Sequence, residues 1–131
     1  MKLQVGVKSL IKKDDAYLFL RRSRSFGEGQ QDWDIPGGRI EPEESLDAAL
    51  TREVYEETGL QLNTIGTLIA AQDIFVTTKD LHVVRLTYAS SATGTVTISD
   101  EHSEYVWMTK KQVLSEQHVD KYLRHVLEGV V

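Results

Sequence analysis

Apolar and polar residues alternate from the start of the chain. The alternation over residues 3–12 predicts a strand with Val7 on one face and Lys8 on the other. Lys13-Asp14-Asp15 has the composition of a turn, and residues 16–22 again favour a strand. The first two strands are therefore predicted to form a hairpin.

The β pattern resumes beyond a polar, glycine-containing stretch. Residues 23–32 are expected to form an exposed, mobile loop, after which Trp33 and Ile35 alternate into the core on a short strand. The remaining expected segments are a β-rich stretch over 62–78 with a bend or bulge at Gly66, a turn at 77–80, a strand at 81–89, a loop or short edge strand at 90–100 and a strand at 105–108.

Helical periodicity dominates the middle of the chain. Leu46, Leu50 and Val54 recur every fourth residue and predict an apolar stripe along one side of a helix. Ser45 is a suitable N-cap, and Gly59 stands where a helix needs a left-handed C-terminal residue. The sequence therefore predicts a helix between these two residues.

Two further helices are expected near the C-terminus. Thr109 is a suitable N-cap for one, and apolar residues within 118–127 recur at helical spacing for the other. Strands and helices are thus interleaved, while the hairpins exclude an all-parallel sheet. We expect residues 1–131 to form a single α/β domain with a mixed sheet and a helix on each side.

Composition narrows the class of protein. The chain has 131 residues, of which 40% are hydrophobic and 27% charged, as in soluble globular domains. No apolar run reaches the length of a membrane span, and the N-terminus lacks a signal-peptide pattern, so we expect a cytoplasmic protein. The net charge of −5 argues against general affinity for nucleic acid, and the absence of cysteine excludes a zinc–thiolate site.

Three carboxylates crowd one face of the central helix. Glu53, Glu56 and Glu57 are spaced three and four residues apart, and their like charges repel one another. A divalent cation between them would reverse the sign of that interaction, and oxygen ligands suit Mg²⁺. The alternative is a solvated acidic face without a metal.

The residues around this triplet follow a fixed spacing. Gly38 is followed after five positions by Glu44, and after seven more by the run Arg52–Leu60, which contains all three acids and ends in glycine and an apolar residue. This stretch resembles the Nudix box, the signature of the Nudix (MutT-like) hydrolase family. The preceding Trp33–Gly38 is similar to the family's entry into the box. The resemblance implies a Nudix-type α/β/α sandwich.

The resemblance also implies a reaction. Nudix hydrolases use water and a divalent metal to cleave the pyrophosphate linkage of a nucleoside diphosphate joined to another moiety. Mg²⁺, or Mn²⁺ in its place, is then expected to be held by Glu53, Glu56, Glu57 and the carbonyl oxygen of Gly38. Arg52 is expected to pair with an acid such as Glu44 and to hold the metal-bearing turns together.

A proton acceptor for the attacking water is expected near the metal. Glu53 is one candidate, and the resemblance implies another acid from a loop after the central strands. Glu101 is the first choice there and Glu104 the second, because Glu104 is predicted to be fixed within the following strand. The alternative is that these acids are ordinary surface residues.

Three residues outside the box are expected to contact the substrate. Arg22 ends the second strand and is expected to contact phosphate, Phe75 to stack on the base, and Arg85 to meet a phosphate or base edge. His82 is expected to have a structural role. A nucleoside triphosphate, ordinary or oxidised, is the preferred substrate. ADP-ribose or another sugar nucleotide, and a non-catalytic nucleotide-binding module, are the alternatives; the sequence is compatible with a homodimer.

Overall fold

The structure is a computed structural model that describes residues 1–23 and 32–130; the predicted loop at 23–32 lies almost entirely outside this range. The elements in chain order are β1 (Lys2–Lys13), β2 (Ala16–Arg22), β3 (Trp33–Asp34), β4 (Gly37–Arg39), α1 (Leu46–Thr58), β5 (Gln61–Val76), the 3₁₀ turn η2 (Thr77–Lys79), β6 (Leu81–Thr93), β7 (His102–Thr109), α2 (Lys110–Leu114) and α3 (Lys121–Glu128).

Strand β1 is the centre of a mixed sheet. Along one edge it pairs in parallel with β6, and along the other it pairs with β4 and then with β2, both antiparallel. The main path of the sheet runs β3-β2-β1-β6-β5, with β4 and β7 attached to β1 and β2. The predicted hairpin of β1 and β2 is confirmed, with Lys13 opposite Ala16.

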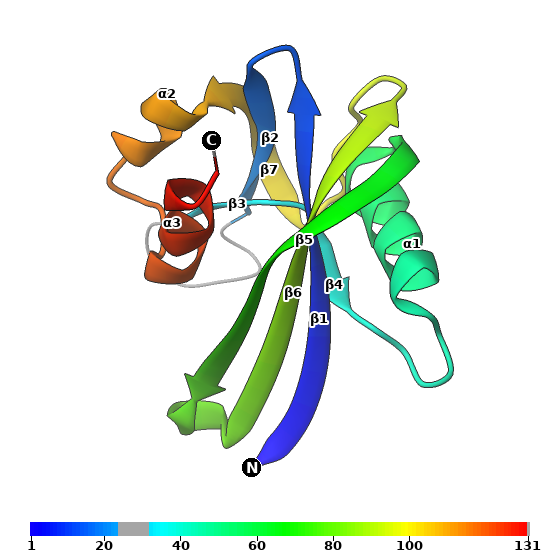
Figure 1. The fold of residues 1–131 in the computed structure, drawn as a ribbon, viewed down its shortest axis with the longest axis vertical. Helices are drawn as coiled ribbons and strands as arrows, with labels where there is room; N and C mark the ends of the chain where they lie inside the picture. The colour runs from blue at the N-terminus through cyan, green and yellow to red at the C-terminus, as the bar shows by residue number, and fades with distance from the viewer. Residues whose placement is uncertain (24–31, 131) are drawn as a thin grey trace.

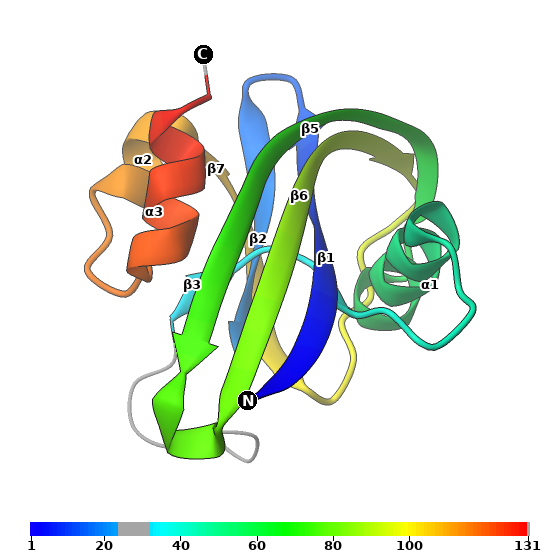
Figure 2. The same cartoon turned by 60° about the horizontal axis from the view of Figure 1, so that its bottom comes forward.

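Helices cover both faces of the sheet. Figures 1 and 2 show α1 on one side and α2 with α3 on the other, while β1, β5 and β6 extend beyond the helices at one end. Each side has its own apolar core: Leu50 and Val54 of α1 pack with Val7, and Leu123 and Leu127 of α3 belong to the opposite cluster. The predicted α/β/α arrangement with a mixed sheet is confirmed.

The central helix begins and ends at the predicted residues. The Ser45 hydroxyl accepts a hydrogen bond from the backbone N–H of Ala48, and Gly59 adopts a φ of 72° that favours glycine. Leu50 and Val54 are fully buried, but Leu46 is 36% exposed, so the predicted apolar stripe is shorter than expected. Leu46 is the first residue of α1 and is not part of the buried cluster that contains Leu50 and Val54.

Several predicted boundaries were wrong. Residues 90–93, expected in a loop or edge strand, extend the interior strand β6, because the long strand β5 supplies partners as far as Gln61 opposite Thr93. Strand β7 begins earlier than the predicted 105–108. The last helix begins later than predicted, after an Asp120 N-cap that accepts from the N–H of Leu123. The predicted irregularity at Gly66 is confirmed by register shifts around it.

Candidate active site

A cavity of about 570 Å³ opens beside α1, and residues of β1, β4, β6 and the start of β7 line it with Glu53 and Glu57 of the helix. Its volume lies within the range of small-molecule sites. Acidic and basic side chains both line it. The acids are Asp32, Asp34, Glu53, Glu57, Glu101 and Asp120, and the cations are Lys8, Arg22, Arg39 and Arg85.

Two consecutive glycines bring the turn at Pro36 and the start of β4 against α1. Gly37 has a φ of +150°, and a Cβ there would stand 2.0 Å from the carbonyl oxygen of Val7. A Cβ on Gly38 would stand 2.6 Å from the carboxyl carbon of Glu53. Only glycine leaves room for the carboxylate at this place. Gly37 and Gly38 are therefore a steric requirement of the site.

The carboxylate of Glu57 lies in a partly buried position beside this turn. Its Oε1 accepts a 2.8 Å hydrogen bond from the backbone N–H of Gly37. Burial nevertheless raises the pKa of Glu57 to about 7, against the opposing effects of the Lys8 ammonium and the Gly37 N–H. Without a cation, this carboxyl therefore holds its proton to higher pH than an ordinary glutamate.

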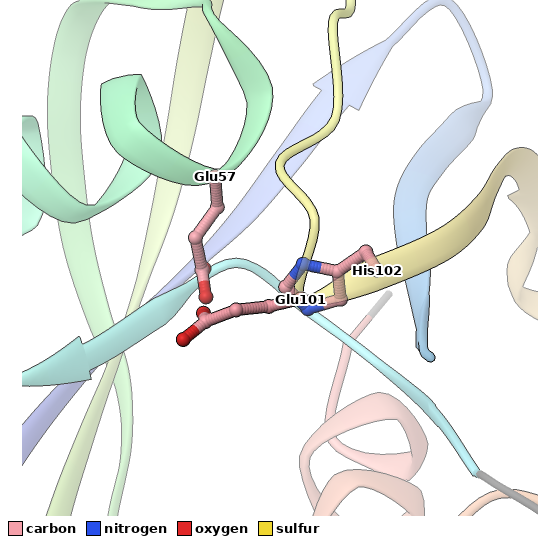
Figure 3. A group of neighbouring side chains, drawn as sticks. All are labelled: Glu57, Glu101 and His102. Atoms are coloured by element: carbon pink, nitrogen blue, oxygen red, sulfur yellow. The ribbon is translucent and has the colours of Figure 1, made fainter. Parts of the chain in front are cut away.

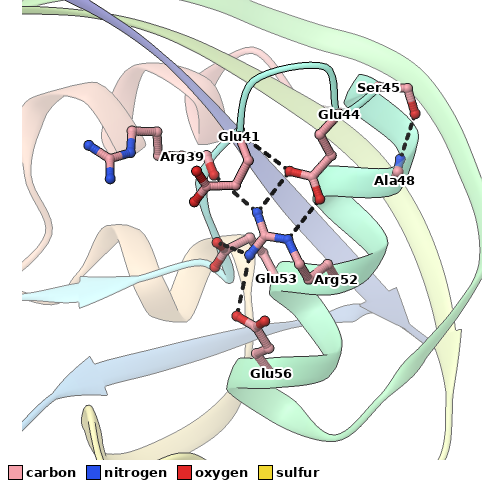
Figure 4. Close-up of polar contacts among 8 residues, drawn as sticks. All are labelled: Arg39, Glu41, Glu44, Ser45, Ala48, Arg52, Glu53 and Glu56. Carbon is pink, nitrogen blue, oxygen red and sulfur yellow. Dashed lines mark hydrogen bonds and ion pairs between the residues drawn. The ribbon is translucent and has the colours of Figure 1, made fainter.

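Arg52 joins the acids of α1 to the loop before it (Figure 4). Its Nε and Nη2 donate to the two carboxylate oxygens of Glu44 at 2.8 and 2.9 Å, and its Nη1 donates to Glu53 at 2.8 Å. Nη2 also reaches the carbonyl of Arg39 at 3.2 Å. These hydrogen bonds lower the pKa of Glu44 to about 2, so the pair stays ionised. The predicted pairing with Glu44 is confirmed.

Only two of the three box acids line the cavity. Glu53 and Glu57 line the cavity together with Gly38, whereas Glu56 is outside the lining and its side chain is 57% exposed. The Glu56 carboxylate is 3.4 Å from the Arg52 guanidinium. A metal-binding role of Glu56 stays a prediction, with weaker geometric support than that of Glu53 and Glu57.

A second set of potential ligands faces Glu57 from the start of β7. Glu57, Glu101 and His102 each offer an oxygen or nitrogen atom, and these atoms lie within 4.8 Å of one another. Figure 3 shows the two carboxylates turned toward each other, with the imidazole ring beside them. Glu104, the second candidate for the proton acceptor, is held away by a 2.9 Å ion pair with Arg21, as its predicted place in a strand implies.

Lys8 and Asp34 are cavity residues that the sequence did not single out. The Lys8 ammonium donates to Asp34 Oδ2 at 3.0 Å and to the carbonyl of Ile35 at 3.2 Å. Burial alone would raise the pKa of Asp34, but the charges of Lys8 and Arg85 hold it below its ordinary value. The signal for Lys8 in the sequence was weak: a lysine on the polar face of the first strand.

The residues predicted to bind substrate fall on opposite faces of the sheet. Arg22 and Arg85 line the cavity. Phe75 pairs with His82 across β5 and β6, so its side chain lies on the face opposite Arg85, and its ring stacks on His82 with centroids 4.4 Å apart. A base-stacking role for Phe75 therefore stays a prediction without support from the cavity.

The donor chemistry of the cavity fits a divalent cation. Carboxylate oxygens of Glu53 and Glu57 are hard ligands, and the missing Cβ of Gly38 leaves the space beside Glu53 that a ligand set needs. The raised pKa of Glu57 indicates an acid whose charge the protein alone does not compensate fully. Gly38, Glu53 and Glu57, with Glu101 opposite, are the residues that would hold the ion.

Known proteins match this chain over nearly its whole length. The nucleoside triphosphatase NudI of Salmonella schwarzengrund is 31% identical over 136 residues, covering 97% of this chain and 96% of the relative. The crystal structure of a MutT protein from Methanosarcina mazei superposes with a TM-score of 0.86 at 29% identity, covering 97% and 91% of the two chains. That of a MutT NUDIX hydrolase from Burkholderia pseudomallei gives 0.87 at 25% identity and covers both chains fully. The NUDIX domain matches residues 2–128, and the chain therefore belongs to the Nudix hydrolase family.

Proposed function

We propose that this Nudix hydrolase cleaves the phosphoric anhydride linkage of a nucleoside triphosphate, ordinary or oxidised, with Mg²⁺ or Mn²⁺. The observation that carries the proposal is that one cavity holds both carboxylates and guanidinium groups. Glu53 and Glu57 stand on α1, and Arg22 and Arg85 line the cavity from β2 and β6. A polyphosphate carrying a bound cation is complementary to both sets of charges.

The cationic side chains bind and orient the phosphates. Arg22 is free of the ion pair that engages its neighbour Arg21 with Glu104, and it lines the cavity beside Glu101. A guanidinium can donate two parallel hydrogen bonds to a phosphate, which fixes the chain of phosphates in one orientation. Arg85 of β6 provides a second guanidinium for the phosphates on the sheet side of the cavity.

The acids of α1 hold the cation, and Arg52 holds the acids. Its hydrogen bonds fix Glu53 and Glu44 relative to each other, so Glu53 needs little reorganisation when it binds an ion. When bound, the divalent ion neutralises phosphate charge and lowers the pKa of a water molecule. Glu57 must give up its proton to take part, since only the carboxylate is a ligand.

Glu101 accepts the proton of the attacking water in this proposal. Its backbone carbonyl accepts a 2.8 Å hydrogen bond from the N–H of Ser23. Its side chain is exposed and lines the cavity opposite Glu57. An exposed carboxylate at a turn can approach the substrate without breaking a structural ion pair. Glu104 lacks that freedom because it is paired with Arg21.

Similarity to one relative favours nucleoside triphosphates over the alternative substrates. The Salmonella relative that matches along almost the full length of this chain is named a nucleoside triphosphatase. ADP-ribose or another sugar nucleotide is the second candidate, because the cavity has room for both kinds of ligand. A non-catalytic module would be expected to have lost metal-site acids, and none is missing here.

A substrate panel tests the proposal. Purified protein is incubated with each common nucleoside and deoxynucleoside triphosphate, an 8-oxo-purine triphosphate, ADP-ribose and a UDP-sugar, with Mg²⁺ and with EDTA. Products are identified by ³¹P NMR, which shows the bond cleaved. We expect the highest kcat/KM for a triphosphate, and no turnover in EDTA. A higher kcat/KM for ADP-ribose or the sugar nucleotide would replace the substrate assignment.

One variant separates catalysis by this cavity from a contaminating activity. Glu57→Gln keeps the size of the side chain and removes its charge, and we expect kcat to fall at least about a hundredfold, since the lost charge stabilises the transition state. Glu128→Gln, an exposed acid at the end of α3, is the matched control and should leave kcat unchanged. Equal activity of the two variants would remove the site from the reaction.

A further inference from the structure

His102 occupies a position in the cavity that the Nudix box does not include. It is the first residue of β7, directly after Glu101, and it pairs across the sheet with Arg22. The ladder between β2 and β7 shifts register between Arg21 and Arg22, and this irregularity lies next to the histidine. Bulges of this kind re-aim side chains at sheet edges.

Three ligand atoms converge at this point. A ring nitrogen of His102 lies within 4.8 Å of carboxylate oxygens of both Glu57 and Glu101 (Figure 3). First-row metals bind imidazole nitrogen and carboxylate oxygen at about 2.0–2.2 Å, so atoms up to about 4.4 Å apart can share one ion. The spacing is therefore close to what one cation would require, with small side-chain adjustments.

The imidazole has a free nitrogen at this place. Among the described residues, Nδ1 of His102 is buried and has no hydrogen-bond partner. Buried polar atoms are nearly always paired, so this nitrogen is open to a ligand. The neutral form of an imidazole ring is the form that binds metals.

We propose that His102 supplies a nitrogen ligand to a divalent cation held jointly by Glu57 and Glu101, and that this ligand gives the site a preference for first-row transition metals over Mg²⁺. The inference deepens the proposed function, since it concerns the cation that the proposed reaction uses. Glu57 belongs to both ligand sets, and it joins this ion to the acids of α1. Glu101 binds the ion through one carboxylate oxygen, and its other oxygen is left to accept the proton of the attacking water.

The preference follows from ligand chemistry. Mg²⁺ binds oxygen and keeps much of its water, whereas Co²⁺ and Mn²⁺ form stronger bonds with imidazole nitrogen. A site made only of carboxylates discriminates weakly between these ions. Exchanging one oxygen ligand for a neutral nitrogen reduces the charge offered to Mg²⁺ and adds a ligand that the transition metals favour.

Pulsed electron paramagnetic resonance of the Mn²⁺-loaded, full-length protein tests the ligand directly. A coordinated imidazole modulates the electron spin echo at ¹⁴N frequencies, and growth with ¹⁵N-histidine replaces this pattern with that of ¹⁵N. We expect the ¹⁴N pattern in the unmodified protein, its replacement on labelling, and its loss in His102→Asn. Absence of nitrogen modulation in the unmodified protein would overturn the proposal, even if the variant failed to fold.

Metal affinity gives a second readout that does not use activity. By titration calorimetry, His102→Asn should weaken Co²⁺ binding at least about tenfold and Mg²⁺ binding by less than about threefold. His125→Asn, an exposed histidine on α3, is the matched control and should change neither the affinities nor the echo pattern. Equal weakening for both ions, or a nitrogen pattern that survives in His102→Asn, would contradict the proposal.

The two proposals fail in different ways. Turnover of nucleotides by a protein whose Mn²⁺ shows no nitrogen modulation would remove the His102 ligand and leave the hydrolase function intact. Nitrogen modulation in a protein without turnover on the substrate panel would establish the metal ligand and refute the substrate assignment.

Discussion

The backbone N–H of Gly37 donates a 2.8 Å hydrogen bond to the carboxylate of Glu57, twenty residues further along the chain. This contact ties the first residue of β4 to the last turn of α1. Hydrogen bonds to charged groups contribute about 1.5–3 kcal/mol, which offsets only part of the cost of burying a carboxylate. The remaining cost is what a bound cation is expected to relieve.

Gly38→Ala should reduce activity much more than stability. The new Cβ would stand 2.6 Å from the carboxyl carbon of Glu53, at the movable end of that side chain, so the carboxylate shifts while the backbone stays in place. We expect kcat/KM to fall at least about tenfold, and the free energy of unfolding to change by less than about 1 kcal/mol. Gly129→Ala, which meets only ordinary contacts, is the control. A variant with unchanged kcat/KM would contradict the role of this glycine.

Arg52→Lys should weaken metal binding although it keeps the charge. Lysine cannot donate in parallel to both oxygens of Glu44 and also to Glu53, as the guanidinium does. Losses of such supporting contacts typically cost about 10–100-fold in metal affinity or activity. Titration calorimetry with Mg²⁺ measures this, and Arg124→Lys on α3 serves as the matched exchange outside the cavity. Unchanged Mg²⁺ affinity would show that Arg52 only stabilises the loop.

The pH dependence of stability follows from Glu57. Its pKa is about 7 in the folded protein and 4.5 ordinarily, so the folded state binds the proton more tightly. In metal-free protein, this residue's contribution to the free energy of unfolding is greatest below pH 4.5 and is lost as the pH rises to about 7. The loss is on the order of 2 kcal/mol, reduced by partial solvent exposure.

Denaturant melts from about pH 5 to 8 measure that loss as the difference between the unmodified protein and Glu57→Gln, which cannot titrate at this position. Saturating Mg²⁺ should abolish the decline, because the ion binds only the ionised, folded form and stabilises it by mass action. Parallel stability curves for the two metal-free proteins would show that the Glu57 pKa is not raised.

Single replacements by glutamine identify the proton acceptor. At saturating Mg²⁺ and substrate, Glu101→Gln should lower kcat by about 10²–10⁴-fold with KM little changed. Glu104→Gln removes only the ion pair with Arg21 and should have an effect of less than about threefold. A loss confined to Glu53→Gln would transfer the role to that residue.

Arg85→Ala and Phe75→Ala distinguish the two faces of the sheet. Arg85 lines the cavity, so its removal should raise KM for the best substrate at least about tenfold through a lost charged hydrogen bond. Phe75 is 56% exposed on the opposite face, and its replacement should leave KM within about twofold. Steady-state kinetics give both values. A raised KM for Phe75→Ala with an unchanged KM for Arg85→Ala would place the base on the face of the sheet that carries Phe75 and His82.

The metal-bearing helix could be predicted because its determinants are local. Ser45, Gly59 and the spacing of the acids lie within one short stretch, where capping and periodicity act directly. The mixed sheet followed from the same reasoning, since hairpins and interleaved helices restrict the connections. Arg52 was expected to pair with an acid such as Glu44, and the structure confirms that pair.

The remainder of the site depends on contacts that sequence patterns do not encode. Phe75 and Arg85 were both assigned to the substrate, yet the register of β5 on β6 places them on opposite faces. A shift of one residue would have reversed this result. His102 and Lys8 come from strands far apart in the sequence, and only the assembled sheet brings both to Glu57.

The parallel pairing of β1 with β6 has a consequence for synthesis of the protein. Lys2 lies opposite Leu81 and Ile11 opposite Ser90, so one edge of β1 stays open until most of the chain has left the ribosome. Such distant contacts slow folding, because a long loop must close before they form. During translation the nascent chain thus displays an unpaired β1 edge, which chaperones or a neighbouring nascent chain can bind first.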